Sequence, residues 1–146
     1  MTAPVLISAC LLGEACRYDG KSSEQTELID RIRDKQLISV CPEVEGGLPT
    51  PRPPAEVKGD QVLRENGVDV TSQFIKGSEF CRDKGISEKV TLAILKSRSP
   101  ACGCGQIYNG SFTKTLVEGD GIFTQTLKAA GFECVSDEDF LNDKAN

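Results

Sequence analysis

The sequence contains no histidine and no tryptophan, and only 5% of its residues are aromatic. The absence of histidine excludes Ser-His-Asp and Cys-His catalysis, zinc sites that use an imidazole, and an imidazole general base. Any acid–base chemistry must therefore use carboxylates, lysine, tyrosine, cysteine or water.

Long hydrophobic runs and an excess of positive charge are absent as well. No apolar stretch approaches the length that crosses a bilayer, and the N-terminal segment lacks the basic residues of a secretory signal. The chain has 17 Lys and Arg against 22 Asp and Glu, which gives a net charge of −5. This balance argues against a non-specific grip on a nucleic-acid backbone. We therefore expect a cytoplasmic protein with no membrane association and no clear nucleic-acid-binding surface.

The chain does contain seven cysteines among its 146 residues. That length suits one compact domain, and we take residues 1–146 as a single domain. Without a secretory signal we expect a reducing compartment, where clustered cysteines indicate metal binding or catalysis more often than disulfides. The competing interpretation is that each cysteine is a small hydrophobic residue of the core.

Strand-like and helix-like segments alternate along the chain. Apolar runs predict strands at 5–9, 37–40, 90–95 and 132–135. Apolar periodicity predicts helices at 22–35, 71–84 and 120–130, followed by a short acidic helix. This order predicts an α/β fold, with a Rossmann-like and mainly parallel sheet, helices on both faces, and a long proline- and glycine-rich loop at the carboxyl ends of the strands.

Local signals refine the boundaries of these elements. Ser22 and Gln25 resemble a capping box that would open the first helix, and Gly85 would close the second helix. The dipeptides Asn66-Gly67 and Asn109-Gly110 predict two short hairpins. The segment 42–54 holds five prolines, and we call it the proline loop. Because ordered loops of this length tend to be functional, we expect it to contribute to a site.

Three cysteines follow three of the predicted strands. Cys10 comes after the first strand, Cys41 after the second, and Cys102 in the loop after the third. Ligands of open α/β sheets bind outside the carboxyl ends of the strands, so neighbouring strands would bring these thiols to one edge. Thiolates without a histidine partner favour zinc or an iron–sulfur cluster. Coincidence among buried cysteines is the alternative.

The other four cysteines differ in their surroundings. Cys81 lies on the apolar stripe of a helix and Cys134 in the last strand, which favours core positions for both. Cys104 lies between two glycines and is either a flank of the site or incidental. Cys16 lies in a loop over the same sheet edge, where it could replace one of the three ligands or lie beside them.

Three segments resemble a known family. SACLLGEACRYDG (8–20), CPEVEGGLPTPRPPAE (41–56) and ILKSRSPACGCGQIYNGSF (94–112) closely resemble the TudS-type thiouracil desulfurases. The predicted connecting helices, with VDVTSQFIKG and GDGIFTQTLKAAG, are similar too, so the resemblance covers nearly the whole chain. Each motif is long and internally specific.

The resemblance implies an enzyme that removes sulfur from thiolated uracil without redox chemistry, giving uracil and hydrogen sulfide. It implies a 4Fe–4S cluster held by Cys10, Cys41 and Cys102, with one iron open to the substrate's sulfur. Cys16 stays an alternate ligand because of its position in the loop over the same edge. Glu43 and Ser99 match the family's acid–base pair. The family commonly has Ser-Pro-Ser-Cys where this chain has Ala101, which puts in doubt any contact that the second serine makes.

Several interpretations stay open at this point. Without histidine, Glu43 is the most plausible general base, and the competing interpretation is a solvated carboxylate beside a turn-capping Ser99. Arg52, Glu45 and Glu56 could line the pocket or form surface ion pairs. The expected partner is a small thiolated pyrimidine. The alternatives are another thiolated nucleoside or tRNA base, or a non-catalytic metal- or cluster-binding module in which Cys16 is a fourth ligand.

Overall fold

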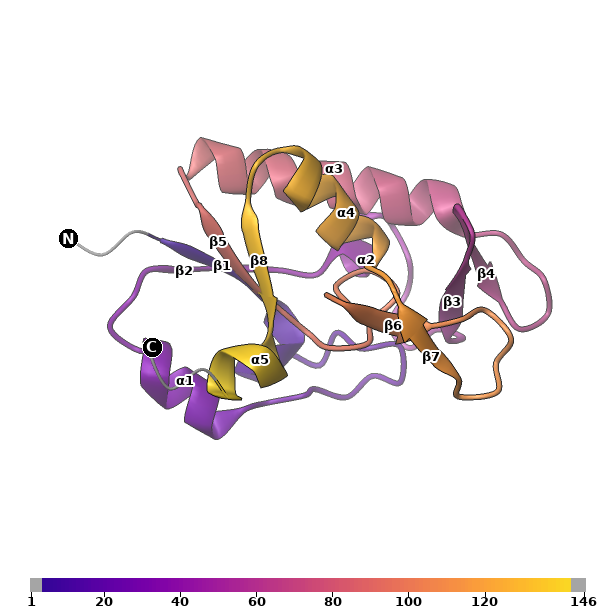
Figure 1. The fold of residues 1–146 in the computed structure, drawn as a ribbon, viewed down its shortest axis with the longest axis horizontal. Helices are drawn as coiled ribbons and strands as arrows, with labels where there is room; N and C mark the ends of the chain where they lie inside the picture. The colour runs from indigo at the N-terminus through magenta and orange to yellow at the C-terminus, as the bar shows by residue number, and fades with distance from the viewer. Residues whose placement is uncertain (1–3, 143–146) are drawn as a thin grey trace.

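The computed structural model describes residues 4–142, whose centre is a four-stranded parallel sheet (Figure 1). The strands are β1 (Val5–Ser8), β2 (Leu37–Val40), β5 (Leu92–Leu95) and β8 (Glu133–Ser136), in the order β2-β1-β5-β8. Every residue of β1 is buried, as its unbroken apolar run predicts for an inner strand. From β1 the chain continues to β2 on one side and later to β5 on the other, so the direction of the connections reverses between β1 and β5. Ligands of α/β sheets bind at such a switch point.

Helices cover both faces of the sheet, which confirms the predicted fold class. The helices α3 (Thr71–Ser87) and α4 (Ile122–Ala129) pack on one face, and α1 (Thr26–Ile32) and α5 (Asp137–Asn142) on the other (Figure 1). Because side chains alternate along a strand, Leu6 of β1 joins the core under α3 and α4 while Ile7 joins the core over α1 and α5. The sheet is thus buried between two hydrophobic layers.

Two small hairpins and two short helices extend the sheet's carboxyl edge. The hairpins are β3 (Ala55–Lys58) with β4 (Gln61–Arg64), and β6 (Gln106–Tyr108) with β7 (Leu116–Glu118). The 3-10 helix η1 (Ala9–Leu12) follows β1, and α2 (Pro42–Glu45) follows β2 and begins the proline loop. Proline at the first position of α2 fits a helix start, because its missing N–H has no partner there in any case.

One predicted hairpin forms in part and the other has a different partner strand. The chain reverses at Asn66-Gly67, where Leu63 and Asp69 form an antiparallel bridge and Val70 donates its backbone N–H to Val62 at 2.9 Å, while the other edge of β4 pairs with β3. The strand β6 pairs with β7 across residues 109–115 and not with Phe112. The Asn109-Gly110 dipeptide indicates a tight turn, and the exposed strand β7 has no hydrophobic pattern that would indicate the actual partner.

Two predicted helix ends are also wrong. The helix α1 begins at Thr26, so Ser22 lies in the preceding loop and the capping box does not form. Gly85 lies inside α3, where a Cβ would meet Leu6 and Phe132 at 3.1 Å. This glycine therefore permits close packing of α3 on the sheet and does not end the helix. Gly131 does follow the end of α4, with a φ of 91° as a C′ glycine requires.

None of the helices found between residues 4 and 142 has the length and apolar character needed to cross a membrane.

Candidate active site

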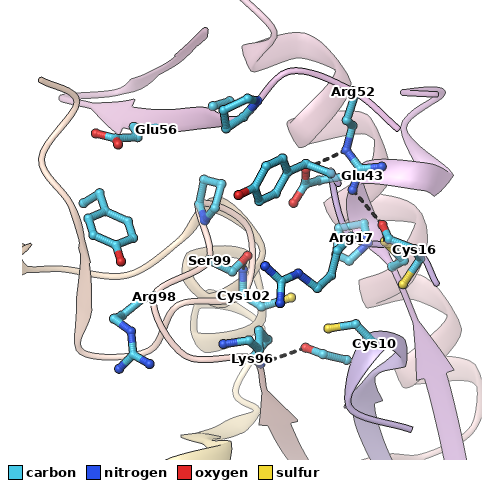
Figure 2. Close-up of a pocket in the computed structure, with 18 of the residues that line it drawn as sticks. Cys10, Cys16, Arg17, Glu43, Arg52, Glu56, Lys96, Arg98, Ser99 and Cys102 are labelled. Carbon is cyan, nitrogen blue, oxygen red and sulfur yellow. Dashed lines mark hydrogen bonds and ion pairs between the residues drawn. The ribbon is translucent and has the colours of Figure 1, made fainter. Parts of the chain in front are cut away.

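A cavity of about 560 Å³ opens at the carboxyl edge of the sheet, beside the switch point between β1 and β5 (Figure 2). Its walls come from the segments that follow β1, β2 and β5 and from the two hairpins. The lining includes the side chains that the sequence analysis singled out as site candidates: Cys10, Cys16, Cys41, Glu43, Ser99 and Cys102. Residues from three separate stretches of the chain are thus brought to one place.

The three strand-end cysteines line this cavity as the topology predicts. Cys10 lies in η1 directly after β1, Cys41 is the residue before α2, and Cys102 lies in the loop after β5. Cys10 and Cys102 are buried, and Cys41 is partly exposed. The remaining cysteines separate from them: Cys81 is fully buried in the core under α3, and Cys104 and Cys134 are not among the cavity's lining residues.

Cys16 belongs to the same cluster of thiols. Its side chain contacts those of Cys10 and Cys41, and the contact with Cys10 is the largest cause that raises the pKa of Cys16 to about 11. The contact with Cys16 and burial raise the pKa of Cys41, while burial raises that of Cys102 against an opposing hydrogen bond with Ser8. These raised pKa values mean that a metal must displace protons to bind here.

The donor set fits an iron–sulfur cluster better than a single metal ion. Thiolates are soft ligands, and the cavity offers four cysteines and no imidazole. Within residues 4–142, no three His, Cys, Asp or Glu side chains are placed to hold one ion. A polynuclear cluster requires only one thiolate on each of several irons, so its ligands do not have to converge on a single point.

Glu43 is a partly buried carboxylate that lines this cavity. It lies in the first turn of α2, and its side chain is 17% exposed. The Oε1 atom accepts a hydrogen bond of 3.0 Å from Nε of Arg52. Burial raises the pKa of Glu43 above its usual value, and the charge of Arg52 opposes that rise. A carboxylate with a raised pKa is suited to accept a proton near neutral pH.

Ser99 caps the turn that carries Cys102. Its Oγ accepts hydrogen bonds from the backbone N–H groups of Ala101 and Cys102, at 3.1 and 2.9 Å. A hydroxyl has two acceptor positions and one donor, so both acceptor positions are used and the O–H is left to donate. Because Ser99 lines the cavity, this proton is available to a bound molecule.

The N-terminus of α4 holds the same turn from behind. Backbone N–H groups of Ile122 and Phe123 donate to the carbonyl oxygens of Pro100 and Ala101, at 3.0 and 2.9 Å. The first N–H groups of a helix have no partner inside it, and here the turn supplies them. Ala101 is 1% exposed and packs in the core, so its side chain does not line the cavity.

Comparisons with known proteins agree with this chemistry. The model of the 2-thiouracil desulfurase family matches residues 5–139, which is nearly the whole chain. The chain belongs to the 2-thiouracil desulfurase family. It is 34% identical over 149 residues to the protein YbbK of Bacillus subtilis (strain 168), covering 95% of this chain and 98% of YbbK.

A solved structure is similar over the same extent. It is described as the [4Fe-4S]-dependent thiouracil desulfidase TudS (DUF523Vcz), and it matches with a TM-score of 0.91 and 39% sequence identity. The match covers 97% of this chain and 95% of that one. The similarity in fold therefore covers nearly all of the chain, including the segments that form the cavity.

Other lining residues of this family member were harder to find from the sequence. Arg52 and Glu56 line the cavity, but Glu45 does not. Sequence reasoning missed the cations and aromatic residues that surround the opening: Lys96, Arg98, Tyr108, Phe112 and Lys114. The signal for the first two was their position directly after β5, whereas the last three depend on the β6–β7 hairpin, whose pairing the sequence did not predict.

Proposed function

We propose that this chain hydrolyses thiolated uracil to uracil and hydrogen sulfide with the help of a 4Fe–4S cluster. Membership of the 2-thiouracil desulfurase family and the similarity to TudS support an enzyme of this type. The observation that carries the proposal is that Cys10, Cys41 and Cys102 share one cavity with Glu43 and Ser99.

Cys10, Cys41 and Cys102 are the proposed ligands of the cluster, with Cys16 as the alternate ligand. The cluster, when bound, supplies an open iron that acts as a soft Lewis acid toward the thiocarbonyl sulfur. Each proposed ligand follows a different strand, so the sheet itself sets the spacing between the thiols.

Glu43 is the proposed general base. Arg52 occupies its Oε1, and no other donor among the described residues hydrogen-bonds to its carboxylate. The second oxygen is therefore free to take a proton from a water that attacks the ring carbon of the substrate. Ser99 donates its hydroxyl hydrogen to an oxygen or nitrogen of the pyrimidine ring and so orients the ring for this attack.

The reaction balances without a redox partner. Water supplies the oxygen of the new carbonyl group and both hydrogens, and the C–S bond breaks with its electron pair on sulfur. Glu43 accepts one proton from the water and passes it to the departing sulfur, which leaves as hydrogen sulfide. Neither carbon nor sulfur changes its oxidation state.

A thiolated nucleoside or nucleotide is the second candidate substrate. Besides Arg52, the lining includes four cationic residues, Arg17, Lys96, Arg98 and Lys114, although the whole chain has a net charge of −5. A free base uses none of these charges, whereas a phosphate group binds to such residues. Sulfide release from thiouracil, thiouridine, its monophosphate and thiolated tRNA, measured side by side, ranks these substrates.

The Glu43→Gln variant tests the catalytic part of the proposal. The amide keeps a hydrogen-bond acceptor for Arg52 but cannot take the proton, so we expect unchanged iron content and a loss of sulfide release of at least about 100-fold. Equal turnover by the wild type and the variant would exclude Glu43 as the base. Full iron content without turnover on any of these substrates by the wild type would favour a non-catalytic cluster-binding module.

A further inference from the structure

Arg52 is a buried cation at the end of the proline loop. Its side chain is 2% exposed, against 34% for Arg17 and 33% for Arg98, the other arginines of the cavity. Withdrawing a charge from water is costly unless partners compensate for it. The burial of Arg52 therefore indicates that nearby hydrogen-bond acceptors compensate for its charge.

The guanidinium of Arg52 joins the loop at Cys16 to two parts of the proline loop (Figure 2). Its Nε donates to Glu43 at 3.0 Å, and its Nη2 donates to the carbonyl oxygen of Cys16 at 2.8 Å. Its Nη1 donates to the carbonyl oxygen of Pro49 at 3.1 Å and to Oγ1 of Thr50 at 2.9 Å. The backbone N–H of Arg52 adds a bond of 2.7 Å to the carbonyl oxygen of Tyr18.

Only an arginine side chain can make this set of contacts. The guanidinium is planar and presents five N–H donors in fixed directions, whereas a lysine ammonium has three donors on one atom. One donor fixes a single oxygen of Glu43, and two others hold the loop that carries Cys16 and the middle of the proline loop at Pro49. The same side chain thus contacts both the carboxylate of Glu43 and the backbone of Cys16.

We propose that Arg52 is a positioning residue for the desulfuration reaction. It holds Glu43 with its second oxygen toward the cavity and holds residues 16–18 against the same wall. This inference rests on the proposed function of Glu43 as the general base. Arg52 contacts neither substrate nor cluster in this account, and its effect on the rate passes through Glu43.

The Arg52→Lys variant tests this role in the iron-loaded full chain with 2-thiouracil as the substrate. Lysine keeps the charge but loses the directed donors, so we expect kcat to fall about 100-fold, as for a small misplacement of a catalytic group, while KM stays within about threefold. Iron per chain should equal that of the wild type. The matched control is Arg33→Lys, because the Arg33 side chain is 71% exposed and, among residues 4–142, pairs only with Asp30.

Amide hydrogen exchange gives a second readout that does not depend on turnover. Loss of the bonds to Cys16 and to residues 49–50 should speed exchange in the segment 14–22, and exchange in α3 should not change. If wild-type protein releases no sulfide, the proposed function fails, and the exchange result alone decides whether Arg52 holds this segment.

Three results would overturn the proposal: a kcat within threefold of the wild type, a rise in KM that accounts for the loss of kcat/KM, or unchanged exchange in segment 14–22. If Arg52→Lys does not fold, Thr50→Val takes its place, because it removes one acceptor and leaves the contact with Glu43. We expect a fall in kcat of about threefold with KM unchanged for Thr50→Val, and an unchanged kcat would count against Arg52.

Discussion

The wall of the cavity that carries Cys41 and Glu43 is tied together by a side chain, whereas the wall that carries Ser99 and Cys102 is tied by the main chain. On the first wall, the buried Arg52 donates to Glu43 and to the loops around it. On the second wall, the N-terminus of α4 donates to Pro100 and Ala101. A single side-chain change can therefore loosen the first wall, and the second is less sensitive to such changes.

The two walls share one feature, which is a glycine contact with the layer behind them. A Cβ on Gly77 of α3 would lie 1.7 Å from the carbonyl oxygen of Pro42, and a Cβ on Gly121 would lie 2.4 Å from the carbonyl group of Ala101. No side chain fits in either place. The close approach of α3 and of the start of α4 thus fixes the positions of the backbone at Pro42 and Ala101.

The largest effect is expected for Gly77→Ala. Its methyl group would push α2 off α3, and overpacking against backbone atoms that cannot move aside should lower the free energy of unfolding by about 3 kcal/mol. Urea denaturation measures this loss. Gly119→Ala is the control, since its Cβ would meet only the Ile107 side chain at 3.2 Å. Similar stabilities of the two variants would show that close approach of α2 does not matter.

Glu43→Ala should give the next largest effect on stability. It leaves the charge of Arg52 buried without its carboxylate, although three other acceptors stay in place. We expect a loss of about 2 kcal/mol in addition to the loss of turnover. Thermal unfolding of the cluster-free protein checks the stability term by itself, and a melting temperature equal to that of the wild type would argue against a compensated ion pair.

Ser99→Ala should cost less, because main-chain bonds to α4 hold the second wall. Two partly buried N–H groups lose their acceptor, for which we expect about 1 kcal/mol. Sulfide release should fall because the hydroxyl donor is lost. A loss of stability as large as that of Glu43→Ala would contradict the difference between the two walls.

The smallest effect concerns Cys81, a fully buried thiol of α3 that lies outside the cavity. Burial raises its pKa to about 12 from an ordinary value of 9.0. As the pH rises above 9, the thiol ionises in the unfolded chain before it does in the folded one. The stability that the buried, protonated thiol contributes is therefore present at low pH and lost at high pH.

Between pH 8 and 9.5 we therefore expect the wild type to lose about 0.8 kcal/mol more than Cys81→Ala. Unfolding free energies of both proteins at several pH values measure the difference. Parallel pH profiles would show that the thiol does not keep its proton in the folded protein.

The elements that depend on strong hydrophobic patterns were predictable from the sequence. The parallel strands β1 and β5 are apolar runs, and the strand-end rule placed Cys10, Cys41 and Cys102 in one cavity before any contact was known. The two-sided helical cover followed from the alternation of elements. These features were predictable because buried strands and helices require a clear pattern of apolar residues in the sequence.

Features that depend on long-range contacts were not predictable. The strand β7 is exposed along its whole length and β3 has only one buried residue, Val57, so neither has a hydrophobic pattern that shows which strand it pairs with. Gly85 serves packing on the sheet, which looks the same in the sequence as a helix end. The role of Arg52 was not visible either, because its partners lie up to 36 positions away.

The central claim is that thiols at three strand ends hold an iron–sulfur cluster, and iron and sulfide analysis of the oxygen-free, reconstituted protein tests it most directly. We expect a brown protein with about four irons per chain and a broad absorbance shoulder, with iron lost in Cys10→Ser and kept in Cys16→Ser. A colourless protein that binds zinc stoichiometrically would contradict the claim. Retention of iron in Cys10→Ser with loss in Cys16→Ser would contradict the proposed ligand set.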